Sequence, residues 1–293
     1  MHDRNETSAF DCRFLSEDHF SSLHQKFVEA FSDYSRPFEF NERQFRNHIV
    51  LNAVDLSRSV GCFRGDELIG FSLNGFGRWE GKSTVYDAGT AVIPSQRRLG
   101  ASEAMFEMMI PLFKVNGVEQ FLLEVITTNE PAVNLYRKLG FEIQRELLLL
   151  EAPGKLKIGR EPNMDITVRR IAAAELSLFA DFWDATPSWQ NSNEAIQRSE
   201  QIKKIVGAFI GDRCVGYIVF SSGLGRVAQF VVDKKHRSLG VGTRLLMAMQ
   251  YDLAEGCKMQ VLNIDSAVAD TVEFLMSRGF ERVLSQFEMV KPL

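Results

Sequence analysis

The sequence predicts an α+β protein with two domains in tandem, each a mostly antiparallel mixed sheet flanked by helices. Three observations lead to this fold class. A chain of 293 residues suits two domains of about 150 residues better than one. Short apolar runs of strand length alternate with longer segments whose apolar residues recur at helical spacing. Finally, the same set of short sequence motifs occurs twice along the chain in the same order.

The repeat is visible at four places that keep their order in both halves. From the first glycine of the pattern to the second there are 40 residues in one half and 39 in the other. Chance rarely reproduces such an order at such a spacing, so we interpret the halves as two copies of one unit. The matches are Val92 with Val232, Arg97 with Arg237, Leu99-Gly100 with Leu239-Gly240, and Gly140-Phe141 with Gly279-Phe280.

The boundary between the copies lies at residues 153–165, which are rich in Gly, Pro and charge and are flanked by apolar strands. Such a composition is typical of a linker. We therefore expect a first domain at residues 1–152 and a second domain at residues 166–293.

The elements of the first half follow from local patterns. Apolar residues at helical spacing mark the helices, and short apolar runs bounded by turn residues mark the strands. We expect strands at 11–15, 59–64, 67–74, 84–93, 121–126 and 147–150, a Gly-rich connection at 75–82, and helices at 17–32, 41–49, 99–116 and 129–141.

The same criteria apply to the second half. Its Gly-Asp-Arg at 211–213 indicates a hairpin, as Arg-Gly-Asp-Glu at 64–67 does in the first half. We expect strands at 166–170, 205–210, 214–221, 226–232 and 258–264, and helices at 172–183, 191–199, 239–255 and 267–277.

The helix at 129–141 has clear start and stop signals. Asn129 can cap its N-terminus, and Pro131 suits the first turn, where a missing N–H is harmless. Gly140 supplies the C-terminal stop, and Phe141 can pack back on the helix. Tyr136 stands on the apolar face of this helix, where a core tyrosine with a satisfied hydroxyl is one interpretation and a functional residue is the other.

Composition and charge exclude several classes of protein. The content of 45% hydrophobic and 25% charged residues is ordinary for a globular chain. Residues 1–152 carry 16 Lys and Arg against 22 Asp and Glu, so neither half is basic enough for a nucleic-acid binder. An acidic first half favours a cationic partner such as an amine, although ordinary surface composition explains the same bias.

The cysteines and the apolar runs bear on the compartment. No C-x-x-C motif and no histidine at ligand spacing accompanies the cysteines, so we expect reduced cytosolic thiols that pack in the core, and no metal site. The N-terminus is polar rather than a secretory signal, and no apolar run approaches ~18 residues. We expect a cytoplasmic protein without a membrane span. The cysteines are Cys12, Cys62, Cys214 and Cys257.

In each half a strand leads into a Gly-containing turn that opens a helix, at residues 95–102 and 234–243. A helix N-terminus presents unpaired N–H groups and partial positive charge, so it binds phosphate, and small residues let the phosphate approach the backbone. The turns match neither a Walker loop nor a dinucleotide-binding G-x-G-x-x-G motif. A plain helix cap would explain one copy, but two copies after matching strands favour a phosphate site.

These residues together resemble the GNAT superfamily of acyl-CoA N-acyltransferases. Its signature is a strand ending in V-x-P, then Q/R-x-x-G-x-G/A, then a helix N-x-x-A-x-x-L-Y-x-x-x-G-F. The matching segments are Val92-Ile93-Pro94, Arg97–Ser102, Asn129–Phe141, Arg237–Gly242 and Gly279-Phe280. The resemblance implies a tandem GNAT protein that uses acetyl-CoA as co-substrate and acetylates a primary amine by direct attack.

The departures from this signature differ between the halves. In the first half Ser102 replaces the last Gly or Ala of the loop, but serine is still small. In the second half Val268 stands where Asn129 stands, and Leu275 stands where Tyr136 stands. Because leucine cannot donate a proton, we expect the chemistry in the first domain and a degenerate or auxiliary second domain.

The resemblance implies a role for each motif residue. Tyr136 is the acid that protonates the departing thiolate, and Asn129 bonds the pantetheine arm or a water molecule. The backbone at Ala91 and Val92 pairs with pantetheine, and the loop holds the pyrophosphate. The expected cofactor loop is Arg97, Arg98, Leu99, Gly100, Ala101 and Ser102 in the first half, and its counterparts are Val232, Arg237, Ser238, Leu239, Gly240, Val241 and Gly242.

The general base has two candidates. An alkyl amine with a pKa near ~10 is protonated at neutral pH, so a group must take its proton. Glu124 lies inside an apolar strand beside the expected site and is the first candidate, although an outward position would explain it equally. Asp87, on the strand that leads to the loop, is the second candidate.

Several alternatives stay open. The second domain could be active with another acid, or the protein could be a non-catalytic CoA-binding sensor or scaffold. The acceptor could be a small amine or a peptide or protein amine, since the run at 123–126 before Asn129 resembles both kinds of relative. Acyl groups other than acetyl, and a monomer or a homodimer, are compatible with the sequence. The aromatic residues Phe31, Tyr34, Phe38 and Phe40 could cover the acceptor or pack in the core.

Overall fold

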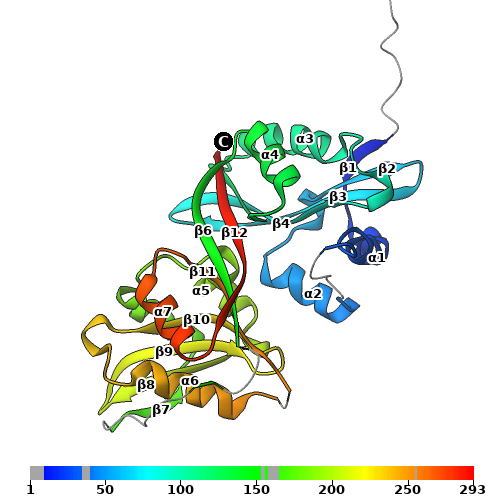
Figure 1. Cartoon of the computed structure of the whole chain (residues 1–293). Coiled ribbons are helices and arrows are strands. Elements are labelled where there is room, and N and C mark those ends of the chain that lie inside the picture. The colour runs from blue at the N-terminus through cyan, green and yellow to red at the C-terminus, as the bar shows by residue number, and fades with distance from the viewer. Residues whose placement is uncertain (1–9, 35–39, 153–155, 158–164, 255) are drawn as a thin grey trace, which may run out of the picture. The chain divides into compact units, whose positions relative to one another are not determined.

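The computed structural model describes residues 10–34, 40–152, 156–157, 165–254 and 256–293. The chain divides into two compact units, each with a sheet and flanking helices (Figure 1). Unit 1 comprises Met1–Val125, Asn129–Ile143 and Met289–Leu293, and unit 2 comprises Ile126–Thr128 and Gln144–Glu288. The predicted α+β class is confirmed. Most of the expected linker at 153–165 lies outside the described residues.

The sheet of unit 1 is antiparallel except at one place. Its strand order is β1-β2-β3-β4-β5-β12, and only β4 and β5 run parallel among its registered pairs. The last strand, β12, belongs to unit 1 from Met289 onward and was not predicted. The bounds are β1 Asp11–Phe14, β2 Val60–Arg64, β3 Glu67–Trp79, β4 Lys82–Val92, β5 Gln120–Ile126 and β12 Glu281–Pro292.

The predicted Gly-rich connection at 75–82 is wrong. The strands β3 and β4 stay paired as far as Trp79 and Lys82, so the turn is only Glu80 and Gly81. Both turn residues have positive φ, 49° and 79°, as a two-residue type I′ hairpin requires. The glycines before the turn therefore lie in a strand, where Gly75 lets the carbonyl oxygen of Asn52 approach to 2.0 Å of where a Cβ would stand.

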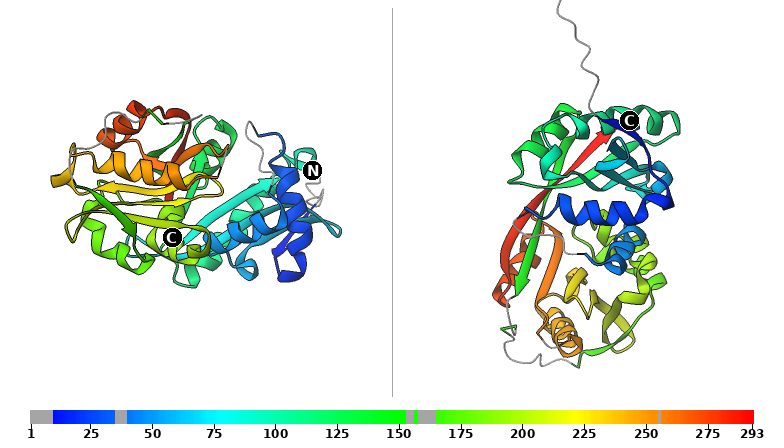
Figure 2. Two further views of the ribbon diagram at one scale, coloured as in Figure 1. Left: turned by 90° about the horizontal axis from the view of Figure 1, so that it is seen from below. Right: turned by 90° about the vertical axis from the view of Figure 1, so that its right-hand side faces the viewer.

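Helices cover both faces of the unit 1 sheet. The helices α1 and α2 lie on one face, and α3 and α4 lie on the other (Figures 1 and 2). Phe27 of α1 packs on Phe71 of β3, whereas Phe106 of α3 packs on Phe121 of β5. The helices are α1 Phe20–Ala30, α2 Glu42–Leu51, α3 Ala101–Val115 and α4 Glu130–Lys138, with short 3₁₀ turns η1 Glu17–His19, η2 Leu56–Arg58 and η3 Pro94–Gln96.

Unit 2 has the strand order β12-β6-β11-β10-β9-β8-β7. In Figure 1, β6 and β12 run side by side. As in unit 1, one registered pair is parallel, here β10 with β11. The bounds are β6 Glu142–Ala152, β7 Thr167–Arg170, β8 Lys204–Ile210, β9 Arg213–Ser221, β10 Arg226–Val232, β11 Met259–Asp265, α5 Asn193–Arg198, α6 Val241–Asp252, α7 Ala269–Ser277, η4 Ala173–Phe182, η5 Trp189–Asn191, η6 Glu200–Ile202 and η7 Lys234–His236.

The helix predicted at 172–183 is present as a 3₁₀ helix and not as an α-helix. The segment forms the 3₁₀ element η4, interrupted at Phe179, where φ is −113°. In a 3₁₀ helix residues three apart eclipse each other, and the rings of Phe179 and Phe182 stack on one side of the element. Phe179 also contacts Tyr217 of β9. Tertiary packing therefore outweighs the helix propensity of this segment.

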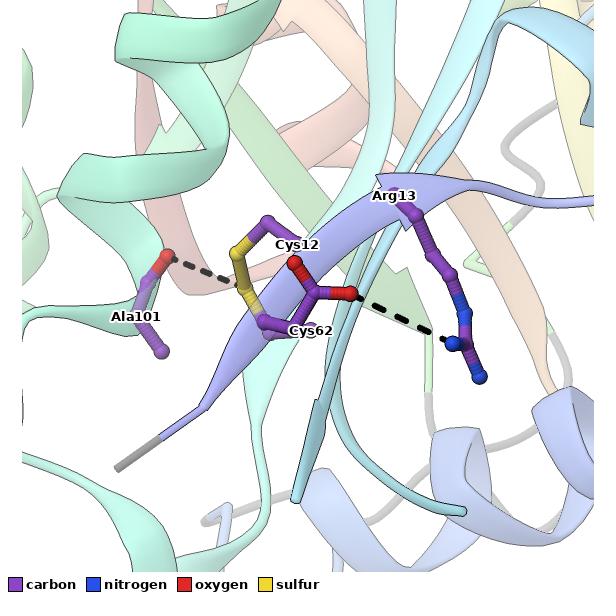
Figure 3. Close-up of a disulfide and its surroundings, with 5 residues drawn as sticks. Cys12, Arg13, Cys62 and Ala101 are labelled. Carbon is purple, nitrogen blue, oxygen red and sulfur yellow. Dashed lines mark hydrogen bonds and ion pairs between the residues drawn. A yellow bond between two sulfur atoms is a disulfide. The ribbon is translucent and has the colours of Figure 1, made fainter. Parts of the chain in front are cut away.

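The prediction of reduced thiols is wrong for two of the four cysteines. Cys12 of β1 and Cys62 of β2 form a disulfide, with their Cα atoms 4.1 Å apart (Figure 3). The antiparallel register places the two residues directly opposite each other. They are 50 residues apart in the chain, so spacing alone could not pair them. Cys214 and Cys257 are free.

Among the described residues, no helix has the length and apolarity that a membrane crossing requires.

Candidate active site

The parallel strands of each unit separate part of the way along. In unit 1, β4 and β5 are in register from Thr84 with Gln120 to Tyr86 with Leu122, yet β4 continues to Val92. In unit 2, the registered pairs of β10 and β11 end at Val227 with Val261. Backbone groups beyond these points, including those of Ala91 and Val92, can pair with an extended polar ligand such as the pantetheine arm of CoA.

The two loops that follow β4 and β10 share one backbone conformation. Arg98 and Gly100 have φ values of 66° and 84°, and Ser238 and Gly240 have 61° and 90°. In both units a helix begins at the residue after this glycine, which is Ala101 in unit 1 and Val241 in unit 2. Alternation of left-handed residues with a helix N-terminus directs several N–H groups to one point, which is an arrangement that binds anions. Leu99, Ser102, Leu239 and Gly242 complete these loops.

The loop arginines contact protein groups. In unit 1, Arg97 donates from Nε to the carbonyl oxygen of Val92 at 3.1 Å and from Nη2 to that of Ala30 at 2.8 Å. Its guanidinium also pairs with Asp33 through two bonds of 2.5 and 2.9 Å. This ion pair lowers the pKa of the Asp33 carboxyl and raises the pKa of Arg97. No sequence pattern pointed to Asp33.

Unit 2 repeats this arrangement. Arg237 donates to the carbonyl oxygen of Val232 at 3.4 Å and pairs with Asp184 at 2.5 Å. In both units an acid that follows the first helical segment therefore holds the loop arginine. The loop motif predicts Arg97 and Arg237 beside the phosphate, but no motif points to these acids.

Tyr136 and Asp87 meet where β4 leaves β5. The Tyr136 hydroxyl donates to Oδ2 of Asp87 at 3.4 Å, and both side chains are buried. Asp87 also accepts from the Gly89 N–H at 2.9 Å and the Thr90 hydroxyl at 3.0 Å. Burial raises the pKa of Asp87 to about 6, although these hydrogen bonds oppose the shift.

The ring of Tyr136 is held by aromatic neighbours. Phe106 of α3 and Phe141 contact it edge-on, with ring centroids 5.7 and 5.8 Å away. Burial, and then the charge of Asp87, raises the pKa of Tyr136 well above its ordinary value. The tyrosine is therefore protonated at neutral pH, whereas Asp87 is mostly ionised.

Asn129 has the capping position that the sequence predicts and a second contact that it does not. Its Oδ1 accepts from the Ala132 N–H at 3.3 Å, and its Nδ2 donates to the Tyr34 hydroxyl at 3.3 Å. Burial raises the pKa of Tyr34. Of the other aromatic residues considered as a cover, Phe31 and Phe40 pack on Phe27, and Phe38 lies outside the described residues.

Glu124 lies on β5 just beyond the last registered pair with β4. Phe121 of the same strand faces α3, and side chains alternate along a strand. Glu124, three residues further on, therefore faces the α1 and α2 side. Asp87 faces the opposite side with Tyr136. The two candidate bases thus lie on opposite faces of the sheet.

The corresponding place in unit 2 has different side chains. Leu275 is fully buried where unit 1 has Tyr136, and Asn263 stands where Glu124 stands. A cavity of about 90 Å³ lies between the separated strands, lined in part by Val232, Arg237 and Val268. Its bordering acids are already paired, Asp184 with Arg237 and Asp265 with Arg145 at 3.3 Å.

Hydrogen bonds also bridge the separated strands of unit 2. Tyr217 donates to Gln229 of β10 at 2.6 Å, and Gln229 donates to the carbonyl oxygen of Asn191 at 2.7 Å. Asn191 in turn donates from Nδ2 to the carbonyl oxygen of Leu262 in β11 at 2.7 Å.

Comparison with known proteins places both halves in one family. An acetyltransferase (GNAT) family model matches residues 20–141, and an acetyltransferase (GNAT) domain model matches residues 172–290. The chain is 39% identical over 66 residues to an N-alpha-acetyltransferase from Sulfurisphaera tokodaii. That match covers 22% of this chain and 40% of the length of the relative.

Solved structures support the tandem fold. A GCN5-related N-acetyltransferase from Sphaerobacter thermophilus has a TM-score of 0.74 at 12% identity and covers 97% of this chain and 96% of its own. A tandem GNAT protein from the clavulanic acid biosynthesis pathway has a TM-score of 0.72 at 14% identity, with 97% and 98% covered. The predicted tandem repeat is confirmed. The chain belongs to the GNAT family of acetyltransferases and carries two GNAT domains.

Proposed function

We propose that this GNAT acetyltransferase moves an acetyl group from acetyl-CoA to a primary amine, with the chemistry in unit 1. The observation that carries this proposal is the hydrogen bond between Tyr136 and Asp87 at the point where β4 and β5 separate. Unit 2 keeps the loop conformation but has Leu275 in place of the tyrosine. A proton donor therefore accompanies the cofactor loop in unit 1.

The groups of unit 1 fit a CoA ester. The amides around Gly100 and the first turn of α3 form the anion site for the pyrophosphate. The edge of β4 at Ala91 and Val92 lies beyond the registered pairs with β5 and suits the peptide-like pantetheine arm, and the Val92 carbonyl oxygen also accepts from Arg97. Because Arg97 is engaged by Asp33 and two carbonyl oxygens, we assign phosphate binding to the loop backbone.

The transfer then needs three proton movements. Glu124 takes a proton from the ammonium group of the acceptor on the α1 and α2 side, and the free amine attacks the thioester carbonyl carbon. A C–N bond forms, the C–S bond breaks, and Tyr136 gives its proton to the leaving thiolate. The surplus proton that the nitrogen still carries after the attack then passes through solvent to the Tyr136 oxygen, which restores the acid. Asp87 orients the Tyr136 hydroxyl and stays ionised at neutral pH. Asp87 is the alternative base, because a pKa of about 6 is close to the working range.

The first candidate acceptor is the α-amine of a peptide or protein. The support is the name of the Sulfurisphaera tokodaii relative, an N-alpha-acetyltransferase. Its match to this chain covers 66 residues. The acidic balance of residues 1–152 suits a cationic acceptor of either size. Small primary amines form the second acceptor class.

A thiol-release assay tests this function. Wild-type protein is incubated with acetyl-CoA and a broad panel of peptides with free N-termini and small primary amines, and product mass identifies the acetylated acceptor. We expect at least one amine to accelerate release well above the hydrolysis background. If acetyl-CoA binds but no amine accelerates release, the protein is a CoA-binding sensor or scaffold instead.

Unit 2 supports a secondary role. Its loop can hold a pyrophosphate, but its proton-transfer positions are Val268, Leu275 and Asn263. We therefore infer that unit 2 binds a CoA ester without turnover or supports the fold. Catalysis in unit 2 by another acid is the alternative, and variants of the two loops separate these possibilities, as described in the Discussion.

A further inference from the structure

We propose that Asp33 and Arg97 form a positioning clamp that couples the cofactor loop of unit 1 to the acceptor side of the sheet. The clamp is defined as the Asp33–Arg97 ion pair together with the bonds from Arg97 to Ala30 and Val92. This inference rests on the proposed function of unit 1 and assigns two positioning residues to it.

The guanidinium of Arg97 is almost fully used by these contacts. Its five N–H groups make four bonds: Nε to Val92, Nη1 and Nη2 to Asp33, and Nη2 to Ala30. Ala30 is the last residue of α1, so the cation also lies at the negative end of that helix. Arg97 thus connects β4, the loop and the end of α1.

The next residue extends the connection to the catalytic helix. Tyr34 follows Asp33 directly and accepts a hydrogen bond from Asn129, the N-cap of α4. Two consecutive residues at the end of α1 therefore contact the cofactor loop and the helix that carries Tyr136. Since α1 covers the face that Glu124 faces, the end of α1 borders the expected acceptor side (Figure 1).

Unit 2 has a counterpart of the Asp33–Arg97 ion pair but not of the Tyr34–Asn129 hydrogen bond. Unit 2 keeps the ion pair, between Asp184 and Arg237, and the bond from Arg237 to Val232. However, Ala185 follows Asp184, and Val268 stands where Asn129 stands. The ion pair accompanies the loop in both units, whereas the tyrosine–asparagine contact occurs where the proton donor occurs. This difference is expected if the clamp links a cofactor loop that holds acetyl-CoA to a catalytic site.

Hydrogen–deuterium exchange tests the clamp without any acceptor. Full-length wild-type protein is compared with and without acetyl-CoA, and exchange is followed at residues 98–102 and at the end of α1. The amides of Phe31 and Ser32 bond to carbonyl oxygens of the last turn of α1, and the amide of Tyr34 bonds to that of Phe31, so all three report on the opening of this end. We expect acetyl-CoA to slow exchange at both segments in the wild type.

The variant Asp33→Asn separates coupling from binding. In this variant we expect acetyl-CoA to slow exchange at 98–102 only, and Asp33→Glu to restore the effect at the end of α1. Asp184→Asn is the matched control, and it should leave the response of α1 unchanged. If the end of α1 is protected equally in Asp33→Asn, or is not protected in the wild type, the clamp is overturned.

Kinetics provide a second readout once an acceptor is known. Because the pair is partly exposed, we expect its loss to raise the acceptor KM by about two- to fivefold and to leave the acetyl-CoA Kd unchanged. A change in acetyl-CoA affinity with an unchanged acceptor KM would contradict a positioning role. Missing protection at 98–102 in the wild type would instead contradict the proposed function, so the two failures are distinguishable.

Discussion

The Tyr136 hydroxyl lies 3.4 Å from Oδ2 of Asp87, and burial raises the pKa of both groups. Because Asp87 has a pKa of about 6, the pair at neutral pH consists of a neutral tyrosine that donates and a carboxylate that accepts. The direction of the hydrogen bond is thus fixed, and the tyrosine keeps the proton that a leaving thiolate would need.

Replacing Tyr136 by Phe should remove the acid and keep the ring packing on Phe106 and Phe141. General acid catalysis contributes about 10²- to 10⁴-fold, so we expect acetyl transfer to fall by about 10²-fold or more. Thiol release at saturating acetyl-CoA measures the loss, and the thermal midpoint checks the fold. Tyr251→Phe, at an exposed tyrosine of unit 2, is the control. Full activity of Tyr136→Phe at every pH would show that Tyr136 is a core residue only.

Replacing Glu124 by Gln should lower kcat/KM at neutral pH and have less effect at high pH. The reason is that amines with pKa values of about 8 to 10 become free bases there and need no proton acceptor. A pH series of kcat/KM for wild type and Glu124→Gln measures this convergence. If Asp87→Asn shows the convergence and Glu124→Gln is fully active, Asp87 is the base.

Replacing Asp87 by Asn should change how stability depends on pH. Between the ordinary pKa of 3.8 and the folded pKa of about 6, the folded protein binds more protons than the unfolded chain. The stability from this group is therefore present below about pH 4 and is lost as the pH rises through about 6. Asparagine does not titrate, so the free energy of unfolding of Asp87→Asn should not show this decrease as the pH rises.

Denaturant unfolding at pH 5 and pH 7.5 measures the difference. From pH 5 to pH 7.5 the free energy of unfolding of the wild type should fall by about 1.5 kcal/mol relative to Asp87→Asn. Equal pH dependence in the two proteins would mean that the pKa of Asp87 is not raised.

Loss of the Cys12–Cys62 disulfide should destabilise unit 1. The bond closes a loop between residues 50 apart, which in the chain-entropy model corresponds to about 4 kcal/mol. Denaturant unfolding of Cys12→Ser should show a lower midpoint, and Cys257→Ser, at a free cysteine, should not. Thiol titration of the unfolded, unreduced protein should find two thiols, and four thiols would contradict the disulfide.

Local signals predicted those elements whose geometry is set within a few residues. The helix at 129–141 is α4, Glu130–Lys138, with Asn129 as its cap, because caps and stops act within one turn. The loops at Gly100 and Gly240 were also predictable, since a left-handed residue before a helix favours glycine. The internal repeat then predicted two copies of one unit, and the resemblance of their motifs predicted the family.

Long-range contacts were not predictable from such signals. Arg97 and Asp33 are 64 residues apart, and Asn129 and Tyr34 are 95 apart, so only the folded sheet brings them together. The disulfide likewise depends on the register of β1 with β2. The strand β12 was missed because its polar and apolar residues do not alternate regularly.

The central claim is that acetyl transfer takes place in unit 1, and matched loop variants test it most directly. Gly100 and Gly240 occupy the same left-handed position, with φ values of 84° and 90°, so glutamate strains both loops equally and adds a charge that opposes phosphate. The measurement is the thiol-release rate of Gly100→Glu and Gly240→Glu with the same acceptor. We predict that Gly100→Glu abolishes turnover and that Gly240→Glu retains most of it, whereas the reverse result would contradict the account.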